Sequence, residues 1–422
     1  MKFMVQMYFE DDADLGILKG KTIAVIGYGN QGRGQALNLR DSGLKVIVGQ
    51  RPGKSFDRAV EDGMKVMSVG EAVRAADAVH ILLPDEMQSK VYYAEIEPNL
   101  KAGATICFSH GFNIHFNQIV PRKDLNVILV APKGPGKAVR QRYEEGIGVP
   151  ALIAVYQDAD GTSQEQAKAF AKGIGAARAG IYVSSFREET ETDLFGEQVD
   201  LCGGLSCMVK ASYQTLVDAG YQPEMAYFET IYEVKQVADL IYEGGLDFMW
   251  RSVSNTAEFG GLTVGPGIIN EESVRNMKKA LDRIQNGEFA KDFLLEGLLN
   301  YPVLKAKERL DRELPQEEVG RRIRSNIPWL AGTPEERRAK EQAAAGKKKK
   351  AAKTVTAAKT EAAGKAKTAP ETETAGKTKT ESKTEAAGKT KTSSKTEATG
   401  KTKTSSKTAS SSKSRKTDAN MK

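Results

Sequence analysis

Between Lys21 and about Val183, short apolar runs rich in β-branched residues alternate with stretches in which apolar residues recur every three to four positions. Runs that are apolar throughout are typical of strands buried on both faces of a parallel sheet, and the stretches between them have the period of amphipathic helices. We therefore predict a doubly wound α/β domain with a parallel sheet. The predicted strands are TIAVIG, KVIVG, AVHILLP, ATICFS, NVILVAP and PALIAVY.

The pattern changes after Phe186. From Glu188 to Leu330 the chain has long helical periodicities and almost no β-type runs, which predicts a second domain made almost entirely of helix. We place a Rossmann-type dinucleotide-binding domain at residues 1–186 and an all-helical domain at 187–332.

Residues 333–422 form a low-complexity tail of Lys, Ala, Thr, Ser, Glu and Gly. They hold 24 Lys or Arg and 10 Asp or Glu, a net +14, which leaves −7 for residues 1–332 because the whole chain carries +7. Burial of so few large apolar side chains cannot offset the entropy of ordering, so we expect a disordered tail. Its charge suits nucleic acid or another polyanion, and a solubilising spacer is the alternative interpretation.

Cysteine usage and the N-terminus bear on the compartment. The three cysteines, Cys107, Cys202 and Cys207, have no CxxC spacing, which argues against a disulfide framework or a zinc site and predicts buried, reduced side chains. The opening MKFMVQMYFEDDADLG lacks the apolar core of a signal peptide, and no segment approaches about 20 apolar residues. We expect a cytoplasmic protein with no membrane partner.

A GxGxxG motif directly follows the first predicted strand and opens a helical stretch. In a Rossmann unit these glycines make a tight turn, admit the pyrophosphate to the backbone and let helix and strand pack closely. The motif predicts a dinucleotide at the helix start, and a glycine-rich turn without ligand is the alternative. The predicted cofactor-binding residues are Gly27, Tyr28, Gly29, Asn30, Gln31 and Gly32.

The end of the second predicted strand bears on which dinucleotide binds. NAD sites usually place Asp or Glu there, whereas this chain reads VIVGQRPGKSF, with Arg51, Lys54 and Ser55 in the following loop. Two cations and a hydroxyl suit a 2′-phosphate, so we predict NADPH; a solvated basic loop is the alternative. Further residues expected at the cofactor are Asp85, Glu86, Met87 and Gln88, which end another strand, and Gly136.

Two pairs of carboxylates stand four residues apart: Asp193 with Glu197, and Glu229 with Glu233. Each pair shares one helix face, where like charges cost about 0.2–0.5 kcal/mol. A pair of Mg²⁺ ions would offset this repulsion, since hard oxygen ligands suit that cation. Apolar and aromatic flanks predict that these carboxylates point into a cleft, and solvated helix faces are the alternative.

Two further polar residues end predicted strands: His110 in CFSHGFN and Lys133 in APKGPG. A doubly wound sheet presents its ligand-facing groups at this edge, and Lys133 can hold an anionic substrate group. His80 lies inside the apolar run AVHILL and is predicted to be a satisfied core histidine. His115 is interpreted as a surface or helix-capping residue.

A series of motifs extends over about residues 1–330: IGYGNQG, ALNLRDSG, LLPDE, SHGFNIHF, APKGPG, VPALIAV, ETDLFGEQ, LCGGL, AGYQPEMAYFE, LIYEGG and SNTAEFG. In these motifs the chain resembles class I ketol-acid reductoisomerase, the acetohydroxyacid isomeroreductase of valine and isoleucine biosynthesis. The resemblance implies that two Mg²⁺ act as Lewis acids on 2-acetolactate or 2-aceto-2-hydroxybutyrate, and that alkyl migration precedes NADPH reduction to a 2,3-dihydroxy acid.

The resemblance also assigns roles to single residues. It leaves open whether a carboxylate, a metal-bound hydroxide or His110 takes the first proton. The residues matched are the metal ligands Asp193, Glu197, Glu229 and Glu233, with Asp193 as the bridge, the substrate-contacting Ser254, and His110 and Lys133 at the reaction centre.

In this family the helical domains of two subunits interlock, which implies a homodimer or larger assembly in which the second carboxylate pair completes the partner's site. The chain departs from the usual GYGSQGHAQ pattern at Asn30, Arg33 and Gly34, and its loop after Arg51 is one residue shorter than in many members. An NADP-dependent hydroxyacid dehydrogenase without an isomerase step is the alternative enzyme. For the tail, polyanion binding is the alternative function.

Overall fold

The computed structural model describes residues 5–332 and Arg337. The predicted disordered tail and its expected polyanion contacts therefore lie outside the described residues, Arg337 apart. Within this range the N-terminal part is a nine-stranded sheet in the order β1-β9-β8-β7-β6-β5-β2-β3-β4. The strands are β1 (Met7–Tyr8), β2 (Thr22–Ile26), β3 (Lys45–Gly49), β4 (Lys65–Met67), β5 (Ala78–Ile81), β6 (Thr105–Phe108), β7 (Asn126–Pro132), β8 (Ala151–Gln157) and β9 (Ile181–Val183).

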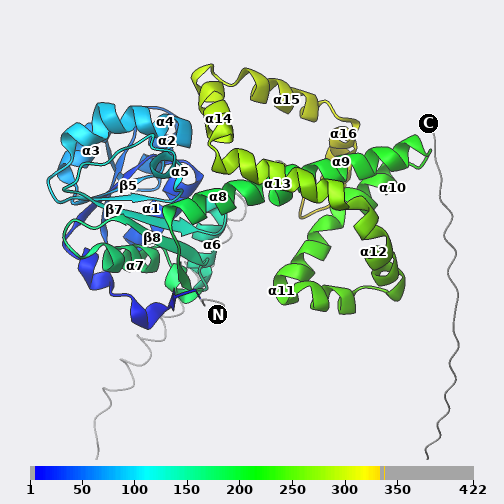
Figure 1. Cartoon of the computed structure of the whole chain (residues 1–422), viewed down its shortest axis with the longest axis horizontal. Helices are drawn as coiled ribbons and strands as arrows, with labels where there is room; N and C mark the ends of the chain where they lie inside the picture. The colour runs from blue at the N-terminus through cyan, green and yellow to red at the C-terminus, as the bar shows by residue number, and fades with distance from the viewer. Residues whose placement is uncertain (1–4, 333–336, 338–422) are drawn as a thin grey trace, which may run out of the picture. The chain divides into compact units, whose positions relative to one another are not determined.

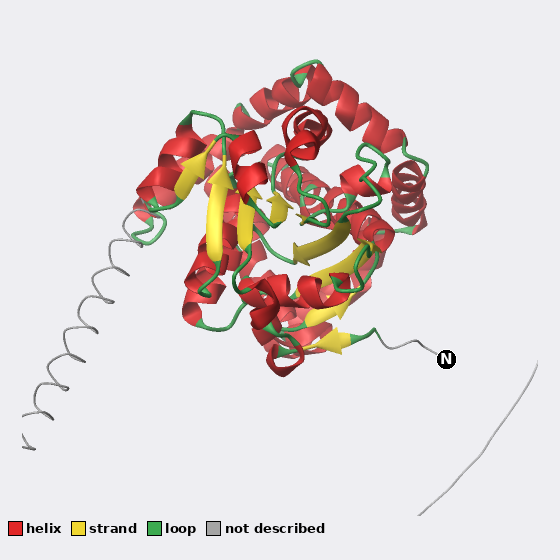
Figure 2. Ribbon diagram, turned by 90° about the vertical axis from the view of Figure 1, so that its left-hand side faces the viewer, coloured by secondary structure: helices red, strands yellow, loops and turns green. Residues whose placement is uncertain are grey.

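Helices cover both faces of this sheet (Figures 1 and 2). Most of them connect successive strands, as a doubly wound fold requires. The helices of this part are α1 (Asn30–Asp41), α2 (Lys54–Glu61), α3 (Val69–Ala75), α4 (Asp85–Val91), α5 (Phe112–His115), α6 (Gly136–Glu145) and α7 (Ser163–Gly173), with the shorter η1 (Glu10–Asp12), η2 (Leu15–Leu18), η3 (Tyr92–Ile96), η4 (Glu97–Asn99) and η5 (Ala176–Arg178).

Strand β2 shows why the apolar runs are continuous. Ile23 and Val25 pack into a core cluster with residues of α1 and α7 on one face of the sheet. Ala24 and Ile26 belong to a second cluster, with residues of α3 and η3, on the other face. Successive side chains of a strand point to opposite faces, so a strand buried on both sides needs apolar residues at every position. The predicted doubly wound fold is confirmed.

The expectation of a wholly parallel sheet is wrong at β8, which runs antiparallel to β7 and pairs Ala154 with Leu129. Helix α6 packs across α1, and the chain then returns through residues 146–150 to the edge where β7 ends. There the N–H of Lys133 donates to the carbonyl of Pro150 at 2.8 Å. Strand β8 therefore starts at that edge and runs back along β7. Strand β9 is parallel to β8, and β1 is antiparallel to β9.

From α8 onwards every described element is helical, which confirms the predicted all-helical domain. Ser185 caps α8 by accepting a hydrogen bond from the N–H of Glu188 at 3.0 Å. Among the described residues, none of the helices combines the length and the apolar character needed to cross a bilayer. The elements are α8 (Phe186–Gly196), η6 (Glu197–Leu201), α9 (Gly203–Asp218), α10 (Pro223–Tyr227), η7 (Phe228–Tyr232), α11 (Val234–Ser252), α12 (Asn255–Ile268), α13 (Glu271–Gln285), α14 (Glu288–Leu298), α15 (Pro302–Arg312) and α16 (Pro315–Asn326).

A small apolar cluster joins the first helices of this domain to the sheet domain. Phe112 of α5 packs with Leu194 of α8, Ile284 of α13 and Ala290 of α14. Helix α14 also contacts α4. Helices α8 and α14 are thereby held beside the loops that follow the central strands.

Helices α1 and α6 cross at two glycines. A Cβ on Gly136 would lie 2.1 Å from the carbonyl oxygen of Asn30, and one on Gly34 would lie 2.5 Å from the carbonyl oxygen of Gly136. Neither position can accept a side chain while the helices keep this separation. The departure from the family pattern at Gly34 therefore has a packing role, and the same contact requires glycine at position 136.

We predict that Gly136→Ala lowers the free energy of unfolding by about 1–3 kcal/mol, because its methyl group would be forced against the backbone of α1. The control is Gly70→Ala in α3, where the nearest atom to an added Cβ is the flexible amide nitrogen of Asn99 at 3.0 Å. Thermal and urea unfolding of both variants would measure the difference. Equal midpoints for the two would contradict this account of the crossing.

Candidate active site

A cavity of about 1270 Å³ lies where the loops after β2, β5, β6 and β7 meet α8 and α14. The carboxyl edge of a doubly wound sheet is the usual place for a ligand crevice. The glycine motif lies in one part of its wall and the acidic face of α8 in another. The predicted site residues that line it are Gly27, Tyr28, Gly29, Asn30, Gln31, Arg51, Ser55, Asp85, Met87, Gln88, His110, Lys133, Asp193 and Glu197.

The glycine motif has the geometry of a nucleotide-binding turn. Gly27 has a left-handed φ of +96°, and a Cβ on Gly32 would lie 2.2 Å from the carbonyl oxygen of Gly27. Gly29, the residue before α1, has no neighbouring atom within 4 Å of a built Cβ. The turn thus leaves open space in front of the helix N-terminus, where backbone amides favour a phosphate.

The loop after β3 contributes a residue that the sequence prediction missed. The side chain of Gln50 accepts a hydrogen bond from the N–H of Tyr28 at 3.2 Å, and it lines the cavity with Arg51 and Ser55. Lys54 begins α2 and is not among the lining residues. The sequence feature that could have identified Gln50 is its position at the end of the second strand, where NAD sites place an acid that contacts the ribose.

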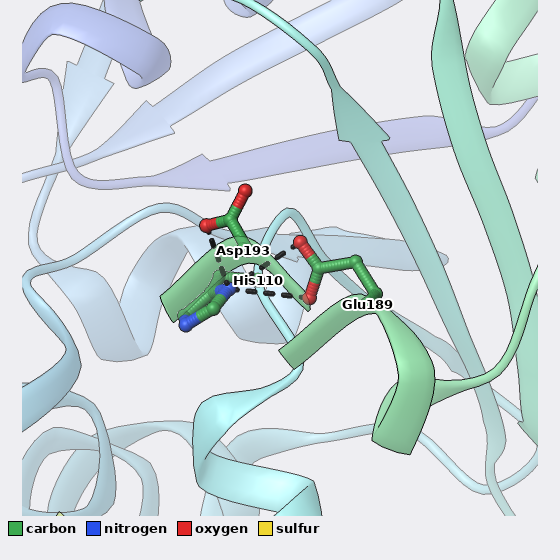
Figure 3. Close-up of side chains that lie close together, drawn as sticks. All are labelled: His110, Glu189 and Asp193. Carbon is green, nitrogen blue, oxygen red and sulfur yellow. Dashed lines mark hydrogen bonds and ion pairs between the residues drawn. The ribbon is translucent and has the colours of Figure 1, made fainter. Parts of the chain in front are cut away.

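The polar cluster at the other part of the wall joins α8 to the sheet. Nδ1 of His110 lies 3.1 Å from Oε2 of Glu189 and 3.5 Å from Oδ2 of Asp193 (Figure 3). Nζ of Lys133 lies 2.9 Å from Asp193 and 3.2 Å from Glu189. The N–H of Gly111 donates to Glu189 at 2.8 Å. Glu189 and Asp193 therefore each face the side chains of His110 and Lys133.

Burial and charge act against each other in this cluster. Burial raises the pKa of Glu189, which is 1% exposed, but the hydrogen bond and charge of His110, together with Lys133, hold it below its usual range. Burial lowers the pKa of His110, but Glu189, Asp85 and Asp193 outweigh it and raise that pKa to about 9. The pKa of Lys133 is also raised, because the two carboxylates outweigh its desolvation. The cluster is thus a compact network of charges.

The start of α4 offers an unpaired acceptor. Nε2 of Gln88 donates to the carbonyl of Leu83 at 2.9 Å and to Asp85 at 3.0 Å, and its buried Oε1 has no partner among the described residues. Burial raises the pKa of Asp85 to about 6. Glu86 accepts a hydrogen bond from the hydroxyl of Tyr301. The orphaned amide oxygen fits a hydroxyl or amide donor of a nucleotide cofactor.

The acidic residues Glu189, Glu191 and Asp193 of α8 divide between two faces of the helix. Glu189 was missed by the sequence prediction, although it precedes Asp193 by four residues and so shares its face. Glu191 lies on another face, where it accepts hydrogen bonds from Arg187 at 2.9 Å and from Gln285 of α13 at 3.0 Å. Glu191 therefore fixes α8 to α13 and has no place in the cavity.

The structure does not bring the second carboxylate pair to this cavity. Glu229 in η7 and Glu233 after it are exposed, and exposed Ser254 caps α12 by accepting from the N–H of Ala257 at 3.2 Å. The predicted site residues that are not among the described residues lining the cavity are Gly32, Lys54, Glu86, Gly136, Glu229, Glu233 and Ser254.

Apolar side chains complete the wall beside the acids. Phe289 and Phe293 come from α14, and Leu201 and Cys202 follow Glu197. Cys202 and Cys207 are exposed, so the expectation of buried cysteines is wrong for these two and right for Cys107.

Comparisons with known proteins agree across both domains. Residues 17–180 match the family described as acetohydroxy acid isomeroreductase, NADPH-binding domain, and residues 186–329 match the ketol-acid reductoisomerase C-terminal domain. A solved NADH-preferring ketol-acid reductoisomerase from an uncultured archean is 46% identical, with a TM-score of 0.75, over 76% of this chain and 99% of that one.

A second solved structure is similar in fold alone. It is a semialdehyde dehydrogenase NAD-binding protein from Cupriavidus necator, 18% identical with a TM-score of 0.50, over 63% of this chain and 99% of that one. The specific likeness comes from the two matched domains and the 46% identical structure. The chain belongs to the ketol-acid reductoisomerase family.

Proposed function

We propose that this reductoisomerase converts 2-acetolactate or 2-aceto-2-hydroxybutyrate into the 2,3-dihydroxy acid with NADPH and two Mg²⁺, as a step of valine and isoleucine biosynthesis. The observation that carries the proposal is one cavity lined both by the nucleotide-binding turn and by His110, Lys133 and Asp193. A cavity of this kind lets a nicotinamide cofactor reach a substrate held at the acidic face of α8.

The donor set on α8 fits a hard divalent cation. Ligand atoms of His110, Glu189 and Asp193 lie within 4.8 Å of one another. Glu189 is buried and engaged by three N–H donors, whereas Asp193 is one-third exposed and Glu197, one turn later, is exposed. We therefore assign the metal to Asp193 and Glu197. When bound, Mg²⁺ polarises the ketol oxygens and NADPH supplies the hydride.

The protein's own groups orient the substrate and exclude water. Lys133 places a positive charge beside Asp193, where it can hold the substrate's carboxylate or a developing negative oxygen. Glu189 engages Nδ1 of His110, and Figure 3 shows Nε2 turned away from both carboxylates. Nε2 is therefore the atom through which His110 exchanges a proton with substrate. Phe289 and Phe293 give this end of the cavity an apolar wall.

The proposed preference for NADPH rests on the loop after β3. Gln50 carries no charge, and Arg51 and Ser55 line the same part of the cavity. A guanidinium and a hydroxyl suit a 2′-phosphate, whereas a ribose 2′-hydroxyl is usually held by an acid at the position of Gln50. The relative from the uncultured archean is NADH-preferring, so the two proteins would differ in their preferred cofactor.

We also propose that two copies of the chain form the complete site. Glu229, Glu233 and Ser254 are exposed on helices whose apolar side chains are also exposed, including Tyr242 at 81% and Phe259 at 71%. So many exposed large apolar groups on neighbouring helices are typical of an interface. A two-fold dimer would cover them and bring this second carboxylate pair to the partner's α8. Further members of this exposed set are Val237, Ile241, Leu246, Phe248, Leu262, Val264, Ile268 and Ile269.

The main test is turnover of 2-acetolactate with each cofactor, with and without Mg²⁺. We expect consumption of NADPH, faster than of NADH, only when substrate and Mg²⁺ are both present. Asp193→Asn should lower kcat/KM by roughly a hundredfold or more, because the Lewis acid contributes several kcal/mol. The matched control is Asp200→Asn, at an exposed residue of η6 outside the cavity lining, which should keep wild-type turnover.

Two outcomes would contradict the proposed chemistry. Full isomerisation by Asp193→Asn would remove the metal assignment. Reduction of 2-keto acids with no metal requirement and no turnover of 2-acetolactate would favour the hydroxyacid dehydrogenase.

The shared site can be tested by complementation. Asp193→Asn and Glu229→Gln should each be inactive as pure dimers. When the two are co-expressed in equal amounts, about half of the dimers are mixed and each has one intact site, so about a quarter of wild-type activity should return. Absence of any recovery in isolated mixed dimers would show that the two carboxylates do not meet across subunits.

A further inference from the structure

A chain of polar side chains runs from the cavity wall into the core beneath it. Gln31, in the first turn of α1, donates from Nε2 to the carbonyl of Gly134 at 2.9 Å. Gln35, one turn later and fully buried, donates to Oε1 of Gln31 at 3.1 Å and to Oγ of Ser109 at 3.0 Å. The helix that carries the nucleotide-binding turn is thereby joined to the loops after β6 and β7.

Ser109 is the centre of this chain. Its hydroxyl donates to the carbonyl of Val130 at 2.8 Å, and Nε2 of His80 lies 3.1 Å from the same oxygen. A hydroxyl has one hydrogen and two lone pairs, so with the hydrogen given to Val130 it accepts from both Gln35 and His80. His80 is opposite Cys107 in the sheet register, and Ser109 lies two residues beyond Cys107 on the same face.

His80 is therefore the buried end of the chain. It is fully buried and packs edge-on against Phe170 at 5.7 Å between ring centroids. Burial lowers its pKa to about 3, which keeps the imidazole neutral at physiological pH. Its Nδ1 has no partner among the described residues. This fits a single tautomer, with the hydrogen on Nε2 and directed at Ser109.

We propose that His80 is a positioning residue for the reductoisomerase reaction, acting through the hydrogen bond from its Nε2 to Ser109. Ser109 directly precedes His110, and Gly134 directly follows Lys133. The hydrogen-bonded chain thus sets the spacing between the nucleotide turn and the two side chains placed at the substrate. This inference rests on the proposed function, because it gives His80 a part in the geometry of hydride transfer.

The role differs from that of an ordinary core residue. An unpaired Nδ1 in an apolar core opposes folding, so a leucine of similar volume should leave stability unchanged or increase it. The glycine turn is held by backbone hydrogen bonds that His80 does not make, such as Gly27 N–H to the Gly49 carbonyl at 3.1 Å. Cofactor binding should therefore survive the change, while the alignment for reaction should not.

The experiment compares the full-length protein with His80→Leu and His80→Gln. Leucine removes the donor, whereas glutamine supplies an Nε2–H donor at comparable reach. For His80→Leu we expect a thermal midpoint at or above wild type, an NADPH dissociation constant within about twofold by cofactor fluorescence, and kcat lower by roughly tenfold. His80→Gln should restore most of kcat. Nitrogen NMR of the wild-type protein should report the Nε2–H tautomer of His80.

Several results would overturn the inference. One is a wild-type kcat in His80→Leu, and another is a kcat in His80→Gln no higher than in His80→Leu. A third is an Nδ1–H tautomer of His80 in the wild-type protein. The last is a loss of stability and NADPH affinity in His80→Leu that accompanies the loss of kcat. Failure of the proposed function is distinguishable, because it would show as absence of turnover in the unsubstituted protein. The tautomer and binding measurements test the hydrogen bond from Nε2 of His80 to Ser109 without any measurement of turnover.

Discussion

The contact between the carboxylate of Glu189 and the loop after β6 is the interaction on which the rest of the site depends. Glu189 is 1% exposed, and a charge so buried persists only with partners that satisfy it. It has the N–H of Gly111, Nδ1 of His110 and Nζ of Lys133. Loss of one partner from such a group typically costs about 3–5 kcal/mol. The contact therefore fixes the first helix of the helical domain against the sheet.

The position of α8 then determines what lines the cavity. A Cβ on Gly111 would lie 2.4 Å from Oγ1 of Thr190, so the loop can approach α8 this closely only with glycine there. With Glu189 held, Asp193 and Glu197 follow on the same helical face and reach the cavity wall. Glu191 is directed elsewhere and binds α13. The four-residue spacing of these acids thus forms a site because the contacts of Glu189 hold α8 against the sheet domain.

Much of this could be predicted from the sequence because the signals are local. The six apolar runs are strands, and the glycine turn opens a helix at the cavity. The direction of β8 could not be predicted, because it depends on where the loop after α6 ends. The four-residue spacing from Glu189 to Asp193 places both on one helical face and separates Glu189 from Glu191, but the contact of Glu189 with His110 depends on how α8 packs. Glu229 and Glu233 have the same spacing as the first pair, yet the single chain leaves them exposed. In the proposed dimer, a second copy of the chain would give these two carboxylates their place in a site.

The most direct test of the central claim is anomalous diffraction from crystals soaked in Mn²⁺ as a substitute for Mg²⁺. We predict metal density bonded to oxygens of Asp193 and Glu197, with Glu189 still hydrogen-bonded to Gly111 and His110. Metal bound by Glu189 in place of those partners, or no metal density at α8 in crystals that contain the proposed dimer, would contradict this assignment.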